Sequence, residues 1–184
     1  MKPSRNQHTI AVSCEIRGRG YWSGREVEVM IHPAPLGTGV RLVRSDLPSQ
    51  PHCDAVVRYR HDANLRTNLA QGKAKFQMVE HLMAAVAALE IDNCVCEINA
   101  EELPALDGSS LGFVEQLSSA GLIVQAAPMK QLVIRDRYRI GTMGGWVEAT
   151  PAHAGESYFE YQLSFDDETP IAPQAFGIEL TPDR

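Results

Sequence analysis

Glu80 and His81 are neighbouring residues whose types could do metal-assisted acid–base chemistry. They begin a segment, 78–93, in which apolar residues recur every three or four positions and predict a helix. In the first turn of a helix, the backbone dipole favours an ionised carboxylate and disfavours a protonated imidazole. A neutral imidazole can bind zinc while a carboxylate beside it takes a proton from water. The pair also fits a structural role, with an acidic residue at the helix dipole and a half-buried histidine.

The helix that would carry this pair is the longest one that the sequence predicts. Its apolar stripe consists of Val79, Leu82, Met83, Val86 and Leu89. Alanines fill most of the remainder at low cost to the helix. A strand over 94–98 follows, and its two cysteines point to one face, where we expect them to act as small apolar residues.

Strands precede this helix and a second helix follows it. We expect strands at 9–16, 26–32, 40–44 and 53–59, with the second and third forming a hairpin around the turn at 33–39. The glycine-rich loop at 17–25 fits no dinucleotide-binding or P-loop pattern. The second helix is predicted over about 111–120 and ends at Gly121. The fold class is therefore α+β, with a sheet covered on one face by two helices.

The last third of the chain predicts strands without helices. Strand patterns occur at 131–140, 145–150, 157–165 and 174–180, after a linker at 125–128. A helix start at 181–183 is followed only by Arg184. Because one face of a sheet normally has to be buried, we expect an incomplete second copy of the same two-layer architecture. The predicted domains are an N-terminal domain at 1–126 and a truncated second domain at 129–184.

Composition limits the partners. The chain has 184 residues and a net charge of -6, which argues against nucleic acid as a partner. No apolar run approaches the length of an integral membrane segment, and the N-terminus has no signal-peptide core. Four scattered cysteines indicate a reduced, cytoplasmic protein.

Several motifs in a fixed order resemble one known family. They are Val-Glu-His-Leu at 79–82, Ile-Asp-Asn at 91–93, Leu-Asp-Gly-Ser at 106–109 and Phe-Val at 113–114. Upstream lie Gly-Arg-Gly at 18–20, Ser-Gly at 23–24, Pro-Ala-Pro at 33–35, Thr-Gly-Val at 38–40 and Arg-Ser-Asp-Leu at 44–47. Together they resemble the UDP-3-O-acyl-N-acetylglucosamine deacetylases of lipid A biosynthesis. The match is dense from residue 18 to 121 and continues weakly to 176.

The resemblance implies two similar domains, each a sheet with two helices, with the helices facing each other around the active site. It implies zinc-dependent removal of acetate from a UDP-linked acylated glucosamine. On this basis His81 is a zinc ligand, Glu80 is the general base toward zinc-bound water, and Asp107 is a supporting acidic residue near the substrate. The implied cofactor is Zn²⁺, with an incomplete site in this chain.

Some residues depart from the family pattern. The family's other two zinc ligands, a His and an Asp four residues later on a second-domain helix, have no counterpart, nor do its later catalytic His and its acyl-binding insert. Trp22 stands where the glycine-rich loop should have a His, and Met78 where a Thr precedes Val-Glu-His. A catalytic zinc normally needs three protein ligands. The remaining histidines, at 8, 32, 52, 61 and 153, show no helical ligand spacing.

Two interpretations stay open. In the first, the chain is the front part of a zinc deacetylase, either a fragment or one chain of a split enzyme that needs a complementing chain or self-association. In the second, it is a degenerate paralogue that binds a sugar nucleotide or a protein partner without catalysis. Trp22 and Met78 favour the second, whereas Glu80, His81 and Asp107 together favour the first.

Overall fold

The computed structural model describes residues 5–130, 132–152, 157–165 and 169–179. The chain divides into two compact units, one from Arg5 to Met129 and one from Lys130 onward, and each is described by itself. The domain limits expected from the sequence stay a prediction.

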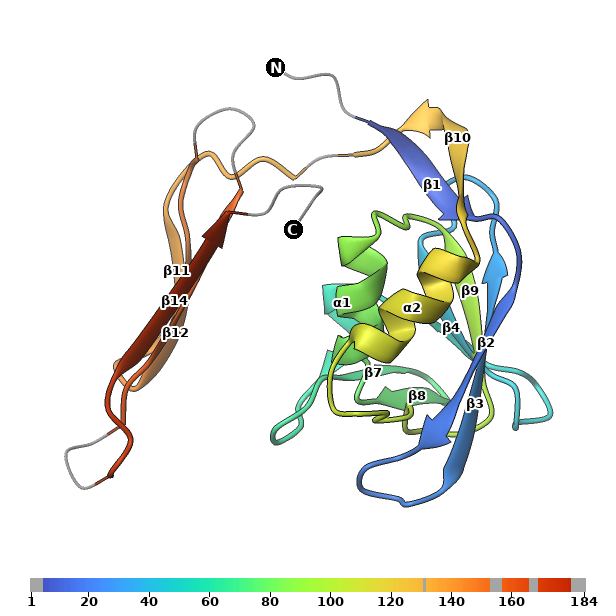
Figure 1. The fold of residues 1–184 in the computed structure, drawn as a ribbon, viewed down its shortest axis with the longest axis horizontal. Coiled ribbons are helices and arrows are strands. Elements are labelled where there is room, and N and C mark those ends of the chain that lie inside the picture. The colour runs from blue at the N-terminus through green and yellow to red at the C-terminus, as the bar shows by residue number, and fades with distance from the viewer. Residues whose placement is uncertain (1–4, 131, 153–156, 166–168, 180–184) are drawn as a thin grey trace. The chain divides into compact units, whose positions relative to one another are not determined.

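A five-stranded sheet lies at the centre of the first unit (Figure 1). Its spatial order is β2 (Cys14–Arg19), β3 (Glu26–Pro33), β9 (Cys94–Ile98), β4 (Val40–Arg44) and β5 (His52–Asp54). Neighbouring strands are antiparallel except β4 and β9, which are parallel. The hairpin expected from 26–32 and 40–44 is wrong, because β9 lies between these two strands. Strands β3 and β4 each pair with β9, and the inward-facing residues of β9 are fully buried. A hairpin would pair β3 with β4 directly and would leave out this buried central strand.

Two helices, α1 (Glu80–Ala88) and α2 (Leu111–Ser119), cover one face of this sheet (Figure 1). The face beneath them is apolar because β3 alternates buried Val27, Val29 and Ile31 with more exposed residues. The helices bury Leu82, Ala85, Val86, Phe113 and Leu117. This arrangement confirms the α+β fold class. No helix among the described residues is long and apolar enough to cross a membrane.

A separate antiparallel pair joins the two ends of the first unit. It consists of β1 (Asn6–Ile10) and β10 (Leu122–Pro128). The single strand expected over 9–16 is therefore wrong, because β1 and β2 belong to different sheets. The linker expected at 125–128 is also wrong, since those residues belong to β10. Gln125 is fixed there because it contacts Asn93 and the carbonyl of Ala34, at 2.8 and 2.9 Å.

A small antiparallel sheet precedes α1. It contains β6 (Arg60–His61), β7 (Asn68–Gln71) and β8 (Ala74–Gln77). The strand expected over 53–59 is shorter than predicted, since β5 ends at Asp54 and a 3₁₀ helix, η1 (Val57–Tyr59), follows. Because β8 ends three residues before α1, the small sheet determines where the helix begins.

The second unit contains two antiparallel strand pairs in its described residues. They are β11 (Tyr138–Thr142) with β12 (Gly145–Ala149), and β13 (Tyr158–Leu163) with β14 (Gln174–Glu179). The strands expected in this region do not join into one sheet, because within the described residues β11 pairs with β12 and β13 pairs with β14. The helix start expected at 181–183 lies outside the described residues. The incomplete second copy stays a prediction.

Candidate functional site

Glu80 is the first residue of α1. The chain enters the helix through Met78, which is buried and has a φ of 57°. A left-handed conformation is uncommon for a residue with a side chain, and the surrounding packing must offset its cost. The tight turn between Gln77 and Val79 therefore fixes where the Glu80 side chain leaves the backbone.

The carboxylate of Glu80 is held by the backbone of Thr67, the residue just before β7. The N–H of Thr67 donates to Oε2 of Glu80 at 3.0 Å. The N–H of Val79 donates in turn to the carbonyl oxygen of Thr67 at 3.2 Å. No side chain caps α1, so Thr67 satisfies a backbone donor at the helix start and orients the Glu80 carboxylate as well.

His81 follows in the first turn and is half-buried. Within the described ranges its ring makes no hydrogen bond or ion pair. In the same ranges no three His, Cys, Asp or Glu side chains come close enough together to hold a metal ion. A catalytic zinc normally has three protein ligands. The described residues therefore offer zinc one ring nitrogen and do not form a complete site.

Asp107 lies in the turn before α2 and is exposed. Its Oδ1 accepts the backbone N–H of Ser109 at 2.9 Å and the Ser109 hydroxyl at 2.8 Å. These bonds hold the pKa of Asp107 below its ordinary value, and the charge of His81 lowers that pKa further. The Ser109 hydroxyl oxygen accepts the N–H of Leu111 at 3.0 Å. Asp107 thus organises the start of α2 and lies within electrostatic range of His81.

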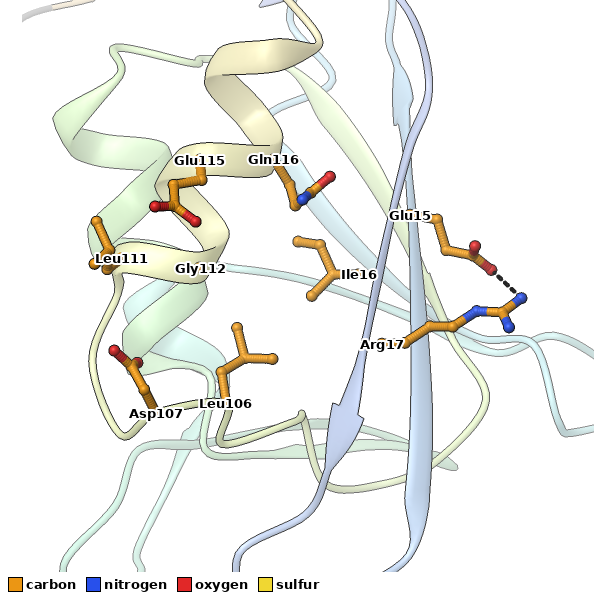
Figure 2. Close-up of a pocket in the computed structure, with 9 residues that line it drawn as sticks. All are labelled: Glu15, Ile16, Arg17, Leu106, Asp107, Leu111, Gly112, Glu115 and Gln116. Atoms are coloured by element: carbon orange, nitrogen blue, oxygen red, sulfur yellow. Dashed lines mark hydrogen bonds and ion pairs between the residues drawn. The ribbon is translucent and has the colours of Figure 1, made fainter.

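A pocket of about 320 Å³ opens beside Asp107 (Figure 2). Leu106 and Ile16 lie between α2 and β2 in this view, and Arg17 pairs with Glu15 on the strand at 2.8 Å. Neither Glu80 nor His81 lines this pocket. The structure therefore places Asp107 at this pocket and does not bring the three predicted residues into one cavity.

The other histidines occupy strands. They are His8 in β1, His32 in β3, His52 in β5 and His61 in β6. His8 Nδ1 lies 3.1 Å from the carbonyl oxygen of Glu90, and His32 Nδ1 lies 2.9 Å from the Ser13 hydroxyl. His153 lies outside the described residues. The histidines that the structure describes join no metal-binding cluster.

Two charged residues near Trp22 were not predicted from the sequence. Glu102 is buried and Arg66 is half-buried, and both line a second pocket of about 280 Å³ together with Trp22 and Gln77. Neither residue stands in a motif. The departure at Trp22 was the only signal that could have led to them.

Comparison with known proteins gives a consistent match along the chain. A family model described as LpxC, UDP-3-O-acyl N-acetylglycosamine deacetylase, matches residues 7–184. The UDP-3-O-acyl-N-acetylglucosamine deacetylase of Myxococcus xanthus is 35% identical over 98% of this chain and 57% of its own length. The Psychrobacter cryohalolentis enzyme of the same name is 34% identical over 88% and 50%. The bifunctional enzyme LpxC/FabZ of Porphyromonas gingivalis is 34% identical over 73% and 29%. The chain spans about half the length of the curated relatives it matches.

Proposed function

The chain belongs to the UDP-3-O-acyl N-acetylglycosamine deacetylase family, and we propose that it contributes the general base, Glu80, to removal of acetate from a UDP-linked acylated glucosamine in lipid A biosynthesis. The observation that carries the proposal is the placement of Glu80 in the first turn of α1. Its Oε2 is held by Thr67, while Oε1 makes no hydrogen bond within the described residues. One oxygen thus fixes the carboxylate and the other is free to accept a proton.

The proposed reaction is hydrolysis of the acetamide. Water attacks the acetyl carbonyl carbon, and Glu80 takes the proton that the water loses. The C–N bond then breaks, and the proton that Glu80 took passes to the nitrogen. The products are the free amine of the glucosamine and acetic acid, which loses its proton to solvent as acetate. Positioned acid–base groups of this kind typically contribute about a hundred- to ten-thousand-fold to the rate.

We assign His81 as one ligand of the zinc ion that such a site uses. It lies beside Glu80 and its ring is free among the described residues. One ligand is fewer than the three of a catalytic zinc site. Completion by a further segment, a complementing chain or a second copy of this chain is therefore part of the proposal.

Asp107 is the proposed substrate contact. Its exposed carboxylate has a lowered pKa and is ionised at neutral pH. It can accept a hydrogen bond from a sugar hydroxyl while it keeps its bonds to Ser109. We place the reaction in the cytoplasm, where the free thiols at 14, 53, 94 and 96 suit a reducing environment.

The proposal can be tested by fusing the chain to the part of the Myxococcus xanthus relative that lies beyond the match. With zinc, the fusion should release acetate from UDP-3-O-acyl-N-acetylglucosamine. Glu80→Gln keeps the shape of the side chain and removes its basicity, so turnover should fall about a hundred- to ten-thousand-fold with unchanged zinc content. His81→Ala should lower the zinc content, and Glu90→Gln, at an exposed glutamate just beyond α1, serves as the control.

Two results would contradict the proposal. Turnover that Glu80→Gln leaves unchanged would reject the role of Glu80 as base. Binding of the sugar nucleotide without acetate release, in a folded fusion that holds zinc, would instead favour the non-catalytic paralogue.

A further inference from the structure

A buried carboxylate fixes the loop that carries Trp22. Glu102 is 5% exposed, and its two oxygens accept the backbone N–H groups of Trp22 and Ser23, each at 2.8 Å. A Cβ at Gly20 would meet the Glu102 carboxylate and the Ser23 hydroxyl, so a larger residue there would displace the groups that hold the loop. The loop is closed at its base by the N–H of Gly20, which donates to the carbonyl of Arg25 at 3.0 Å. Trp22 is therefore held in place although its side chain is 54% exposed.

The ring of Trp22 in turn contacts Arg66. The guanidinium carbon of Arg66 lies 5.2 Å from the ring centroid, which is within the range of a cation–π contact. Arg66 Nε is buried and has no hydrogen-bond partner in the described part of the chain. The Arg66 charge also acts on Glu102 and contributes to lowering its pKa. The Arg66 side chain is therefore held by the ring of Trp22 and the charge of Glu102, and not by direct hydrogen bonds among the described residues.

Arg66 immediately precedes the residue that orients Glu80. Thr67 donates its N–H to the Glu80 carboxylate and accepts the N–H of Val79, so it is tied to α1 at two points. The short strand β6 ends at His61, five positions before Arg66, and β7 begins only at Asn68. The Arg66 side chain connects this segment to the loop at 20–25 through its contact with Trp22.

We propose that Trp22, Arg66 and Glu102 act as positioning residues for Glu80. Glu102 fixes the loop, the loop presents Trp22, Trp22 holds Arg66, and Arg66 keeps the Thr67 amide on the Glu80 carboxylate. The inference rests on the proposed function in that Glu80 is taken as the base. A base confined to one rotamer by a supporting shell is placed for proton transfer more accurately than a free side chain.

The experiment measures amide hydrogen exchange of Thr67 in the 184-residue chain by NMR, without zinc or substrate. Arg66→Ala and Trp22→Ala should each increase Thr67 exchange about tenfold, since one backbone hydrogen bond loses its support. Trp22→Phe keeps an aromatic face and should restore most of the protection. Arg60→Ala, which removes an exposed guanidinium paired with Asp62 in the same small sheet, is the control and should leave Thr67 unchanged.

The outcomes separate positioning from a general structural role. Unchanged Thr67 protection in Arg66→Ala would overturn the inference. Equal loss of protection at Ala70 and Phe76 would overturn it too, because the small sheet as a whole would then depend on Arg66. Because the exchange measurement needs no turnover, a negative exchange result leaves the role of Glu80 as base intact. Conversely, if Glu80→Gln does not slow turnover of the fusion, the role of Glu80 as base is rejected, but the exchange result is unaffected.

Discussion

At the scale of single residues, two strained positions flank the candidate site. Met78, two residues before Glu80, has a φ of 57°, and Leu106, immediately before Asp107, has a φ of 51°. Each lies in a turn that leads toward the first turn of a helix. Residues other than glycine keep a left-handed backbone conformation only where the surrounding structure holds them, and such residues cluster at functional sites. Both turns therefore place an acidic side chain at a defined point near the start of a helix.

Glu102 should make the stability of the protein depend on pH. Burial alone would raise the pKa of Glu102, but hydrogen bonds from Ser23 and Trp22 and the charge of Arg66 outweigh burial and lower it. The pKa is then lower in the folded chain than in the unfolded chain, where it is about 4.3. The unfolded chain binds more protons as the pH falls, so this stabilisation is present above that value and is lost as the pH falls through the folded pKa.

Glu102→Gln tests this at the same residue. The amide has one acceptor oxygen for two N–H donors, so we expect a loss of about 1–3 kcal/mol at pH 7. The difference from the unmodified chain should shrink below about pH 4, as the carboxylate becomes protonated in both states. Urea unfolding followed by circular dichroism at several pH values measures this, with exposed Glu115→Gln as control. A difference that stays constant with pH would contradict the assignment to the charge of Glu102.

Sequence patterns predicted candidate site residues but not the contacts around them. Glu80, His81 and Asp107 stand in motifs, and helical periodicity placed the first two at a helix start. The supporting contacts could not be predicted, because Glu102 meets Trp22 across 80 positions of sequence. Thr67 acts through its backbone, so its side-chain type carries no signal. The roles assigned to Glu80, His81 and Asp107 stay predictions.

At the scale of elements, the Ile-Asp-Asn motif at 91–93 links three strands. The Asp92 carboxylate accepts the backbone N–H of His8 at 2.7 Å and is paired with Arg5 at 2.6 Å. Asn93 is 1% exposed, and its amide nitrogen donates to the side-chain oxygens of Gln7 and Gln125, each at 2.8 Å. The motif therefore joins β1 and β10 to the start of β9. Its part in the resemblance to the deacetylase family is explained by this structural role.

Asn93→Ala should separate this strand pair from the central sheet. The substitution removes both amide donors and the oxygen that accepts the N–H of Gly39 at 2.9 Å. Leaving buried polar groups unpaired should lower the free energy of unfolding by about 2–4 kcal/mol. Urea unfolding measures the effect, and the control Asn6→Ala, at an exposed asparagine of β1, should change stability by less than about 0.5 kcal/mol. Equal effects of the two substitutions would show that the hydrogen bonds of Asn93 are not what stabilises the strand pair.

The errors in the predicted fold have one physical origin. The strands β3 and β9 and the helix α2 were predicted close to their observed bounds because local pattern determines them. The helix predicted over 78–93 is shorter than expected, since α1 runs from Glu80 to Ala88 and is no longer than α2. The pairing of the strands was not predicted, because β9 lies between β3 and β4 in the sheet although it begins 50 positions after the end of β4 in the sequence. The residues of β10 resembled a linker because their alanines and proline are weak strand formers, and it is β1 that holds them.

At the scale of the whole molecule, the two units differ in how much apolar surface they bury. The first unit encloses a continuous core that includes Phe76 and Phe113, both 0% exposed. In the second unit large apolar side chains lie on the surface, with Ile140 80%, Tyr161 65% and Phe176 68% exposed. Exposed apolar surface of this kind marks an interaction site or an aggregation liability. The first unit has the means to fold alone, whereas the second lacks a core among its described residues.

Limited trypsin digestion should therefore leave the first unit intact. The backbone N–H of Met129 still donates to the carbonyl of Arg5 at 2.8 Å, so the protected region should extend to this residue. Exposed trypsin cleavage sites follow at Lys130, Arg135 and Arg137. We expect a stable fragment that ends near residue 130, with loss of the later strands, as measured by mass spectrometry over time.

As a control, a chain of residues 5–129 should unfold in urea with the same midpoint as the fragment. Resistance of residues 138–179 to trypsin, with slow amide exchange in β13 and β14, would show instead that these strands are covered in solution and that the second unit is stable as it stands.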